Sequence, residues 1–350
     1  MFFFLPSSEF RQTGTADVAS ATLPGAHRAS RRARVASSGA PTAARMSSDA
    51  TKADASRTVT ADVLGARFAF AIDPDRLNEA GVVWASAVRK CAEAMAPMIR
   101  NARLPASSAN ARDAGEDELP ALESVNIIEL GTGTGALGIA LASIERTRVF
   151  VTDLEPVVGL ARENAARNAR LKHATSRVEA GALCWSVEPG SVPDPGSVFL
   201  DAIDAHPSYE TETKKQTHRW HFVAACETLY WGGWDVFDDD TRAPQLATMV
   251  EACAGGAVLV VAFTVRDETR EKGFVLNDIG GAFWLRAFDD DVFDVFDDDE
   301  SPSRSPRDAP RDSASDRERA DARARAYVAG ASEGDLLVFR GRLKERRVAT

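Results

Sequence analysis

The stretch VNIIELGTGTG, residues 125–135, decides the fold of this 350-residue chain. Residues 125–128 predict a buried strand, glycines follow at 131, 133 and 135, and an apolar helical run covers 136–144. A second short strand, residues 149–152, ends in Asp153. This order of strand, glycine turn, helix, strand and acid is the first βαβ unit of a nucleotide-type cofactor site. Glycines let the backbone approach a ligand, and the acid can accept hydrogen bonds from both hydroxyls of a ribose. We therefore predict a site for an adenosine-containing cofactor.

The residues of the glycine turn narrow the choice of cofactor. Residues 129–138 contain no Lys or Arg and no Gly-Lys-Ser/Thr, which makes the turn a poor triphosphate cradle. The turn also satisfies the relaxed dinucleotide fingerprint, so NAD stays an alternative. Glu129 would face a pyrophosphate with like charge, but it suits a cationic amine such as that of S-adenosylmethionine (SAM). We predict SAM, with NAD and a glycine turn that binds no ligand as the alternatives.

Bulk properties exclude several partners. The chain is 44% hydrophobic and 27% charged, which is ordinary for a globular protein, and its net charge of −10 argues against nucleic-acid binding. No apolar run is long enough to span a membrane. The four cysteines are far apart and form no Cys-x-x-Cys pair, so we predict no metal site. We expect a monomer.

Residues 1–57 form a compositionally distinct N-terminal extension. Residues 10–48 hold six arginines and one acid among many Ala and Ser, which is the composition of a transit peptide. A plain disordered extension, or a start at Met46, is the alternative. We expect a cytoplasmic protein, and a plastid or mitochondrial one if the extension is a transit peptide.

The remainder, residues 58–350, is predicted to be one domain. Residues 58–64 and 67–72 predict a small hairpin that turns at Gly65, and an amphipathic helix follows residues 81–84 and runs to about 100. Strands and helices then alternate to about 265, which predicts an α/β fold with a mostly parallel sheet covered on both faces. Residues 335–340 predict a last strand.

Two flexible insertions are predicted within this domain. Residues 186–219 are polar, and residues 289–326 combine an acidic run with a mixed-charge stretch. The acidic run, 289–300, carries eight acids in twelve residues. The second insertion shows no apolar periodicity, and its composition is typical of a solvent-exposed insertion.

A second motif lies at the end of the strand predicted over 220–226. Glu227 and Tyr230 follow this strand, and ligands of open α/β sheets bind beyond the carboxyl ends of the strands. With this Glu-x-x-Tyr motif, the sequence resembles the seven-β-strand (class I) SAM-dependent methyltransferases that modify lysines of non-histone proteins. Three further motifs of that family, Gly-x-x-Trp, Asn-x-x-x-Asn and Leu-x-Trp, are matched by Gly81 and Trp84, by Asn164 and Asn168, and by Leu183 and Trp185.

The resemblance covers about residues 60–285 and the last strand. It implies a Rossmann-like sheet of seven strands with SAM as cofactor and a protein as substrate. Residues 261–266 are also similar to the enzymes that methylate translation elongation factor 2, so a translation factor is the narrower candidate. The chain departs from the family at Cys226, at His221 and in its two insertions.

The resemblance also implies the residues of the site. Catalytic roles fall to Glu227 and Tyr230, and cofactor contacts to Trp84, Glu129, Gly131, Thr132, Gly133, Gly135, Asp153, Leu154, Leu183, Trp185 and Cys226.

The expected roles in methyl transfer follow from the chemistry of the acceptor. A lysine amine attacks only when neutral, so Glu227 is expected to anchor and orient the amine and Tyr230 to line its channel. The alternative for this pair is a cap on the following turn. A methyltransferase for small molecules, a SAM-binding module without catalysis and an NAD(P)-dependent oxidoreductase remain the alternative functions.

Overall fold

The computed structural model describes residues 57–103, 122–199, 219–229, 239–288 and 314–344. The N-terminal extension, residues 104–121, the acidic run and Tyr230 lie outside these ranges, so the predictions made for them stay predictions. Within the described ranges, no helix has the length and apolar character needed to cross a membrane.

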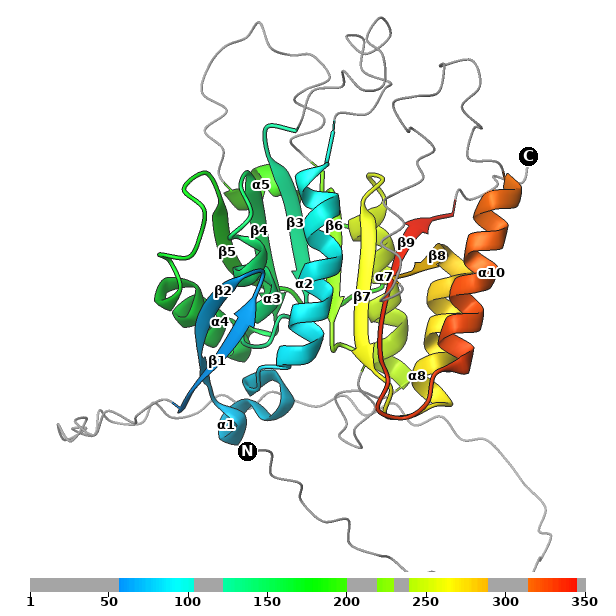
Figure 1. Ribbon diagram of the computed structural model, residues 1–350, viewed down its shortest axis with the longest axis horizontal. Coiled ribbons are helices and arrows are strands. Elements are labelled where there is room, and N and C mark those ends of the chain that lie inside the picture. Colours follow the sequence, from blue (N-terminus) through cyan, green and yellow to red (C-terminus); the bar gives the residue numbers. More distant parts are fainter. Residues whose placement is uncertain (1–56, 104–121, 200–218, 230–238, 289–313, 345–350) are drawn as a thin grey trace, which may run out of the picture. The chain divides into compact units, whose positions relative to one another are not determined.

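A seven-stranded sheet forms the centre of the fold (Figure 1), with the strand order β5-β4-β3-β6-β7-β9-β8. The strands β3 to β7 are parallel, whereas β9 is antiparallel to both β7 and β8. This arrangement confirms the predicted Rossmann-like, mostly parallel sheet. The strand bounds are β3 Val125–Leu130, β4 Thr147–Asp153, β5 Arg177–Ala182, β6 Phe222–Cys226, β7 Val258–Thr264, β8 Phe283–Ala287 and β9 Leu336–Leu343.

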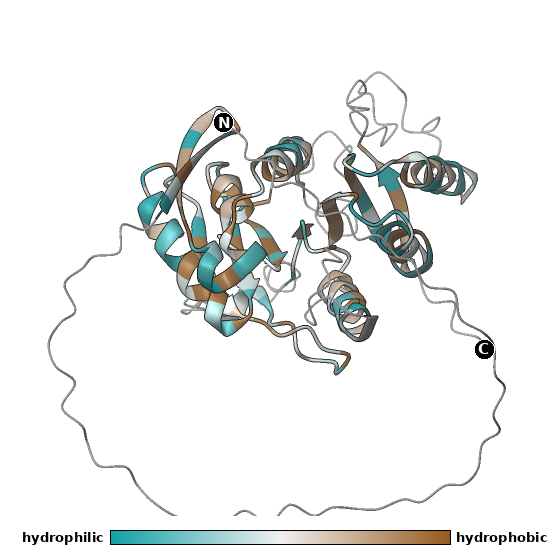
Figure 2. Ribbon diagram, turned by 90° about the horizontal axis from the view of Figure 1, so that it is seen from below, coloured by the Kyte–Doolittle hydropathy of each residue, from teal (hydrophilic) through white to brown (hydrophobic). Residues whose placement is uncertain are grey.

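Helices cover both faces of the sheet, so its central strands are buried on both sides. Every residue of β3 is buried, and Ile127 and Ile128, which point to opposite faces, belong to two separate apolar clusters. One face packs against α2 Ala85–Arg100, α3 Ala136–Leu141 and α4 Glu155–Arg167. The other packs against α5 Pro195–Phe199, α7 Asp239–Cys253, η5 Phe274–Ile279 and α10 Ala314–Gly330, and two short helices, α8 Arg270–Gly273 and α9 Gly280–Ala282, flank η5. Figure 2 shows hydrophilic residues on the outer faces of the helices.

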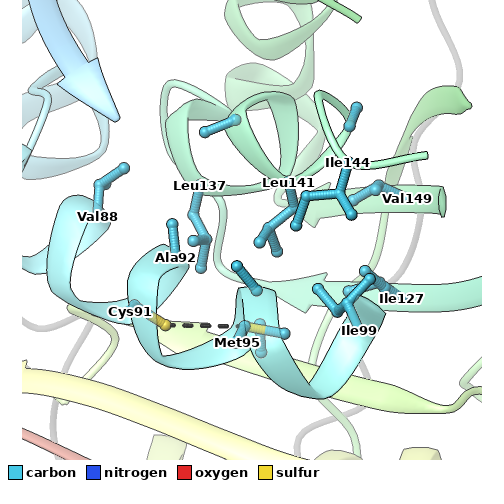
Figure 3. Packing of buried hydrophobic residues seen from close by; sticks show 14 of the residues in the cluster. Val88, Cys91, Ala92, Met95, Ile99, Ile127, Leu137, Leu141, Ile144 and Val149 are labelled. Carbon is cyan, nitrogen blue, oxygen red and sulfur yellow. Dashed lines mark hydrogen bonds between the residues drawn. The ribbon is translucent and has the colours of Figure 1, made fainter. Parts of the chain in front are cut away.

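The packing of α2 illustrates how the first face is closed. Cys91, Met95 and Ile99 on α2 belong to one apolar cluster with Leu141 of α3 and Ile127 of β3 (Figure 3), and all five side chains are buried. Their spacing of four residues is the helical periodicity that predicted this helix. The helix begins directly after Trp84, so its packing places Trp84 at the carboxyl ends of the parallel strands.

The N-terminal hairpin agrees with the prediction. Its strands β1 Arg57–Val63 and β2 Ala66–Ile72 are antiparallel and turn at Leu64 and Gly65. Two short helices follow, α1 Pro74–Leu77 and η1 Asn78–Gly81. We call residues 74–84, which include both helices and lead into α2, the cap segment.

The prediction that residues 186–219 and 289–326 are flexible insertions is wrong in part. Residues 314–330 form α10, which packs on β8 and buries Ala324 and Val328. The Leu285 N–H donates to Asp321 Oδ1 on this helix at 2.8 Å. Small alanines make most of its apolar surface, so its periodicity does not stand out in the sequence.

The start of the first insertion is also ordered. Residues 186–199 are described, and Phe199 is buried against the ring of Trp220. The Trp220 Nε1–H donates to the Pro193 carbonyl at 2.9 Å. These contacts attach the segment to the sheet next to β6.

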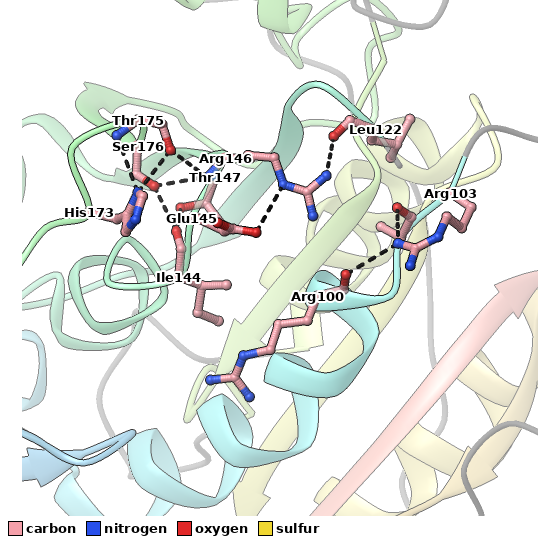
Figure 4. A network of polar contacts seen from close by, with 11 residues as sticks. Arg100, Arg103, Leu122, Ile144, Glu145, Arg146, Thr147, His173, Thr175 and Ser176 are labelled. Carbon is pink, nitrogen blue, oxygen red and sulfur yellow. Dashed lines mark hydrogen bonds and ion pairs between the residues drawn. The ribbon is translucent and has the colours of Figure 1, made fainter. Parts of the chain in front are cut away.

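Polar contacts close the sheet at the end opposite the glycine turn (Figure 4). The Ser176 hydroxyl donates to the Ile144 carbonyl at 2.6 Å and accepts from the Thr147 N–H at 3.3 Å. The Arg146 N–H donates to Thr175 Oγ1 at 3.0 Å. These bonds satisfy backbone groups where the connections enter β4 and β5.

Candidate functional site

A cavity of about 640 Å³ lies at the carboxyl ends of the parallel strands. Its walls include residues that follow β3, β4 and β6, and the strand order reverses between β3 and β6. Open α/β sheets bind ligands at such a switch point. Ten of the eleven predicted cofactor residues line the cavity, namely Trp84, Glu129, Gly131, Thr132, Gly133, Asp153, Leu154, Leu183, Trp185 and Cys226.

The glycine turn forms the floor of the cavity. Gly131 and Gly133 have φ values of 66° and 54°. A Cβ at Gly131 would lie 2.8 Å from Thr228 Cγ2, and a Cβ at Gly133 would lie 2.8 Å from the Ala80 carbonyl oxygen. Both positions therefore require glycine, and the turn presents bare backbone to the cavity, as a close-fitting cofactor needs.

Gly135 is the exception among the predicted cofactor residues. It precedes α3 with a φ of 82°, and a Cβ there would lie 3.3 Å from the Cβ of Ala161 on α4. It does not line the cavity. The third glycine thus allows α3 and α4 to pack closely, and its predicted contact with the cofactor stays a prediction.

Asp153 holds the turn from the end of β4. Its Oδ2 accepts from the Gly133 N–H at 2.7 Å, and its Oδ1 accepts from the Leu154 N–H at 2.8 Å. Burial raises the pKa of this carboxyl, and the two N–H donors oppose the rise. A carboxylate placed here, beside the turn and at the cavity wall, fits the predicted acceptor for ribose hydroxyls.

Glu129 is the second carboxylate beside the turn. Its side chain is buried, and its Oε2 accepts from the Gly138 N–H of α3 at 2.8 Å. Burial raises its pKa to about 7, and the Gly138 N–H is among the donors that oppose the rise. No cation among the described residues forms an ion pair with Glu129. A buried carboxylate that has a raised pKa and no ion pair with the described residues fits a ligand that carries its own positive charge.

Several apolar and polar side chains complete the walls on the cofactor side. A Cβ at Gly131 would lie 3.2 Å from Trp185 Cζ2, so this indole stands over the turn. Leu183 and Leu154 lie on the same wall. The pKa of Cys226 is raised, first by its hydrogen bond with the Cys91 thiol and second by burial. The Cys226 thiol therefore stays uncharged.

Glu227 also lines the cavity, directly after β6. Its φ of 56° is rare for a residue with a side chain, and such strain is concentrated at functional sites. The carboxylate is 2% exposed. Its Oε1 accepts from the Thr264 hydroxyl at 2.7 Å and N–H at 3.1 Å, and its Oε2 pairs with the Arg266 guanidinium at 2.7 Å. Glu227 is therefore held rigidly by the end of β7.

Arg266 and most of the cap segment belong to the site without having been predicted from the sequence. Arg266 lines the cavity, and its guanidinium lies 4.7 Å from the ring centroid of Trp84. It thereby joins Glu227 to the start of α2. Residues 77–80 and Val82 also line the cavity. A lone arginine and a short loop carry no sequence motif, so only the Gly-x-x-Trp pattern pointed to this region.

Acids outnumber cations on the cavity wall. Among the lining residues that the structure describes, Glu79, Glu129, Asp153 and Glu227 are acidic, and Arg266 is basic. Such a cavity favours ligands that carry positive charge.

Comparisons with known proteins agree with this geometry. A family model of lysine methyltransferases matches residues 72–197, which extend from the end of the hairpin through the glycine turn, Asp153 and Trp185. The chain is 48% identical over 52 residues to the release factor glutamine methyltransferase of Deinococcus radiodurans. That match covers 14% of this chain and only 19% of the relative.

Two solved structures show more distant similarity. A protein from Pyrococcus horikoshii described as a transferase is 10% identical, with a TM-score of 0.34, and the alignment covers 67% of this chain and 64% of that one. A predicted O-methyltransferase from Agrobacterium tumefaciens is 16% identical, with a TM-score of 0.31 and 63% and 75% coverage. The glycine turn, its two carboxylates and the match to the lysine methyltransferase family model over residues 72–197 agree on SAM as the cofactor of this cavity.

Proposed function

We propose that this protein transfers a methyl group from SAM to the side-chain amine of a lysine in a non-histone protein. The observation that carries the proposal is the buried carboxylate of Glu227 in the same cavity as the glycine turn. The acidic wall and the lysine methyltransferase family match support a cationic acceptor. A translation factor is the narrower candidate, on the similarity of residues 261–266.

The cavity has to orient the acceptor amine in its neutral form, so the ammonium proton leaves to solvent before the methyl group is transferred. SAM supplies an electrophilic methyl group on a sulfonium, so the protein needs no covalent intermediate. A lysine amine has an ordinary pKa of about 10.4, and its deprotonation at pH 7 costs about 4.6 kcal/mol. A positive charge nearby and a dry channel both lower that pKa.

Glu227 and Arg266 share this task in the proposed mechanism. Thr264 and Arg266 donate three hydrogen bonds to Glu227, and a carboxylate offers about four acceptor positions. The acceptor amine would take the remaining position. The Arg266 charge offsets that of Glu227, so the carboxylate orients the amine without strongly favouring its protonated form. We propose that Tyr230, three residues further on, lines the channel.

Labelling of a cell extract tests the reaction class. The full chain, incubated with radioactive SAM and the extract, should label protein bands whose acid hydrolysate contains methylated lysine. Label that appears only in low-molecular-weight material would instead indicate a methyltransferase for small molecules, and the proposed acceptor would be wrong.

Glu227 variants test the proposed role of the acid. Glu227→Ala should lower methylation at least a hundredfold while affinity for S-adenosylhomocysteine (SAH) changes little, because the lost contact belongs to the amine. Glu227→Asp should keep part of the activity. Glu163→Ala, an exposed acid on α4, is the matched control. Circular dichroism checks the fold of each variant, and near-normal methylation by a folded Glu227→Ala would leave Glu227 only a structural role at the turn.

A further inference from the structure

Asn164 and Asn168 connect helix α4 to the N-terminal hairpin through a ladder of hydrogen bonds. Asn164 Oδ1 accepts from the Ala71 N–H at 2.6 Å, and its Nδ2 donates to the Ala71 carbonyl at 3.0 Å. Asn168 repeats both bonds with Ala69, at 3.0 and 2.8 Å. Each carboxamide thus makes the pair of bonds that a residue of a neighbouring strand would make.

The spacing of the two asparagines explains why a helix can replace a strand here. Four residues of an α-helix rise about 6.0 Å. Two residues of a β-strand rise about 6.6–6.8 Å. Side chains at i and i+4 therefore meet alternate residues of β2, whose other edge pairs with β1. Figure 1 shows β2 beside α4.

The same ladder reaches the cofactor turn. Asn164 Nδ2 also donates to the carbonyl of Thr134 at 2.9 Å, and Thr134 lines the cavity. One buried carboxamide therefore holds both the hairpin and the turn. Asn168 Nδ2 donates to the Asn164 carbonyl at 2.9 Å, which couples the two positions.

The hairpin in turn sets the place of the cap segment. The Asp73 N–H, one residue after β2, donates to the Gly81 carbonyl at 3.0 Å and closes the segment on itself. The Ala80 carbonyl then lies so close to Gly133 that no Cβ fits there. Apolar packing of Phe68 and Phe70 also holds the hairpin, but such packing is non-directional. Directional bonds to fixed side chains determine where β2 ends and the cap begins.

We propose that Asn164 and Asn168 are positioning residues for the cofactor: they place the cap segment over the glycine turn by holding β2 as a strand. The proposal depends on the SAM site but not on the identity of the acceptor. It predicts that cofactor affinity depends on Asn168, a residue that does not line the cavity.

Calorimetric titration of the full chain with SAH tests this coupling. Asn168→Ala should weaken SAH binding about tenfold, since it removes two bonds to β2 and loosens the cap. Hydrogen exchange of residues 66–84 without SAH should become faster. Arg162→Ala is the matched control, because Arg162 lies on the same helix and makes two bonds to the Ala180 carbonyl of β5. It should change SAH affinity less than twofold.

Two results would overturn the proposal. One is an Asn168→Ala variant that binds SAH like the wild type, whether or not the amide hydrogens of β2 exchange faster. The other is an equal loss in the Arg162→Ala control. If Asn168→Ala does not fold, Asn168→Asp keeps the acceptor for the Ala69 N–H and loses the donor, so a smaller loss is expected and unchanged affinity contradicts the proposal. Lost methylation with normal SAH binding would affect only the proposed function.

Discussion

Glu129 shows at the residue scale how burial prepares the site for a cation. Its pKa of about 7 means that roughly half of the molecules carry a proton there at neutral pH. A bound cation favours the charged carboxylate and lowers that pKa, so the proton must leave on binding. SAM affinity should therefore rise about tenfold between pH 5.5 and 7, below the ordinary pKa of an α-amine at about 7.7–8.0. Glu129→Gln should bind SAM with little change over the same range, and equal slopes in calorimetry would contradict this.

Asp153 makes the second prediction at this scale. Asp153→Ala removes the acceptor of the Gly133 N–H and the proposed acceptor of the ribose hydroxyls. SAH affinity should fall by about 1–3 kcal/mol, and Asp153→Asn, which keeps one acceptor oxygen, should lose less. Calorimetry decides it: heat from NADH and none from SAH with the wild-type protein would contradict the cofactor assignment.

At the scale of elements, His221 joins β3 to β6. Its Nδ1 accepts from the Asn126 N–H at 2.9 Å, which requires an unprotonated nitrogen. Burial, and then the Arg219 charge, lower its pKa to about 4. The unfolded chain binds the proton near pH 6.5, so stability is lost as pH falls from 6.5 towards 4, by up to about 3 kcal/mol.

This acid sensitivity can be measured in thermal melts. The melting temperature of His221→Asn should fall less than that of the wild type between pH 6.5 and 4.5. His173→Asn is the control, because His173 lies in an exposed turn. If the melting temperatures of His221→Asn and the wild type fall equally as the pH is lowered, His221 does not cause the loss of stability in acid.

Helix α10 makes the second prediction at the scale of elements. Replacing residues 289–313 by a short Gly/Ser linker should leave the melting temperature within a few degrees, because α10 keeps its contacts. Extending the deletion to 326 removes the bond from Leu285 to Asp321 and buried Ala324, so the melting temperature should drop clearly. Equal melting temperatures would mean that α10 does not stabilise the β8 edge.

At the scale of the whole molecule, we predict that the fold does not depend on the N-terminal extension. Residues 54–350 form one compact unit, and β1 begins at Arg57. The composition of residues 1–53 offers little apolar surface to offset the entropy of ordering. Deletion of 1–53 should therefore leave the melting temperature and SAH affinity unchanged, and a loss of several degrees would show that the extension packs on the domain.

The sequence alone determined the parts of this protein that depend on neighbouring residues. The strand, glycine turn, helix and acid around Gly131 lie within 30 residues of one another, and their periodicity and turn chemistry predict both the sheet and the SAM site. Six of the ten predicted cofactor residues that line the cavity come from this stretch, whereas Trp84, Leu183, Trp185 and Cys226 were implied by the family resemblance. Gly135 lies outside the cavity wall, and a pattern of glycines does not say which of them faces the cavity.

Only the tertiary structure decided which distant groups meet. Arg266 pairs with Glu227 across 39 residues, and Asn164 and Asn168 bind β2 across 93 and 99. Helix α10 was missed because its contacts with β8 come from small alanines and an aspartate. These contacts depend on the order of the strands in the sheet and on the packing of the helices against it. They join residues far apart in the sequence, so no local pattern predicts them. The cofactor turn was therefore readable in the sequence, whereas the ion pair at Glu227 and the ladder that places the cap arise from packing.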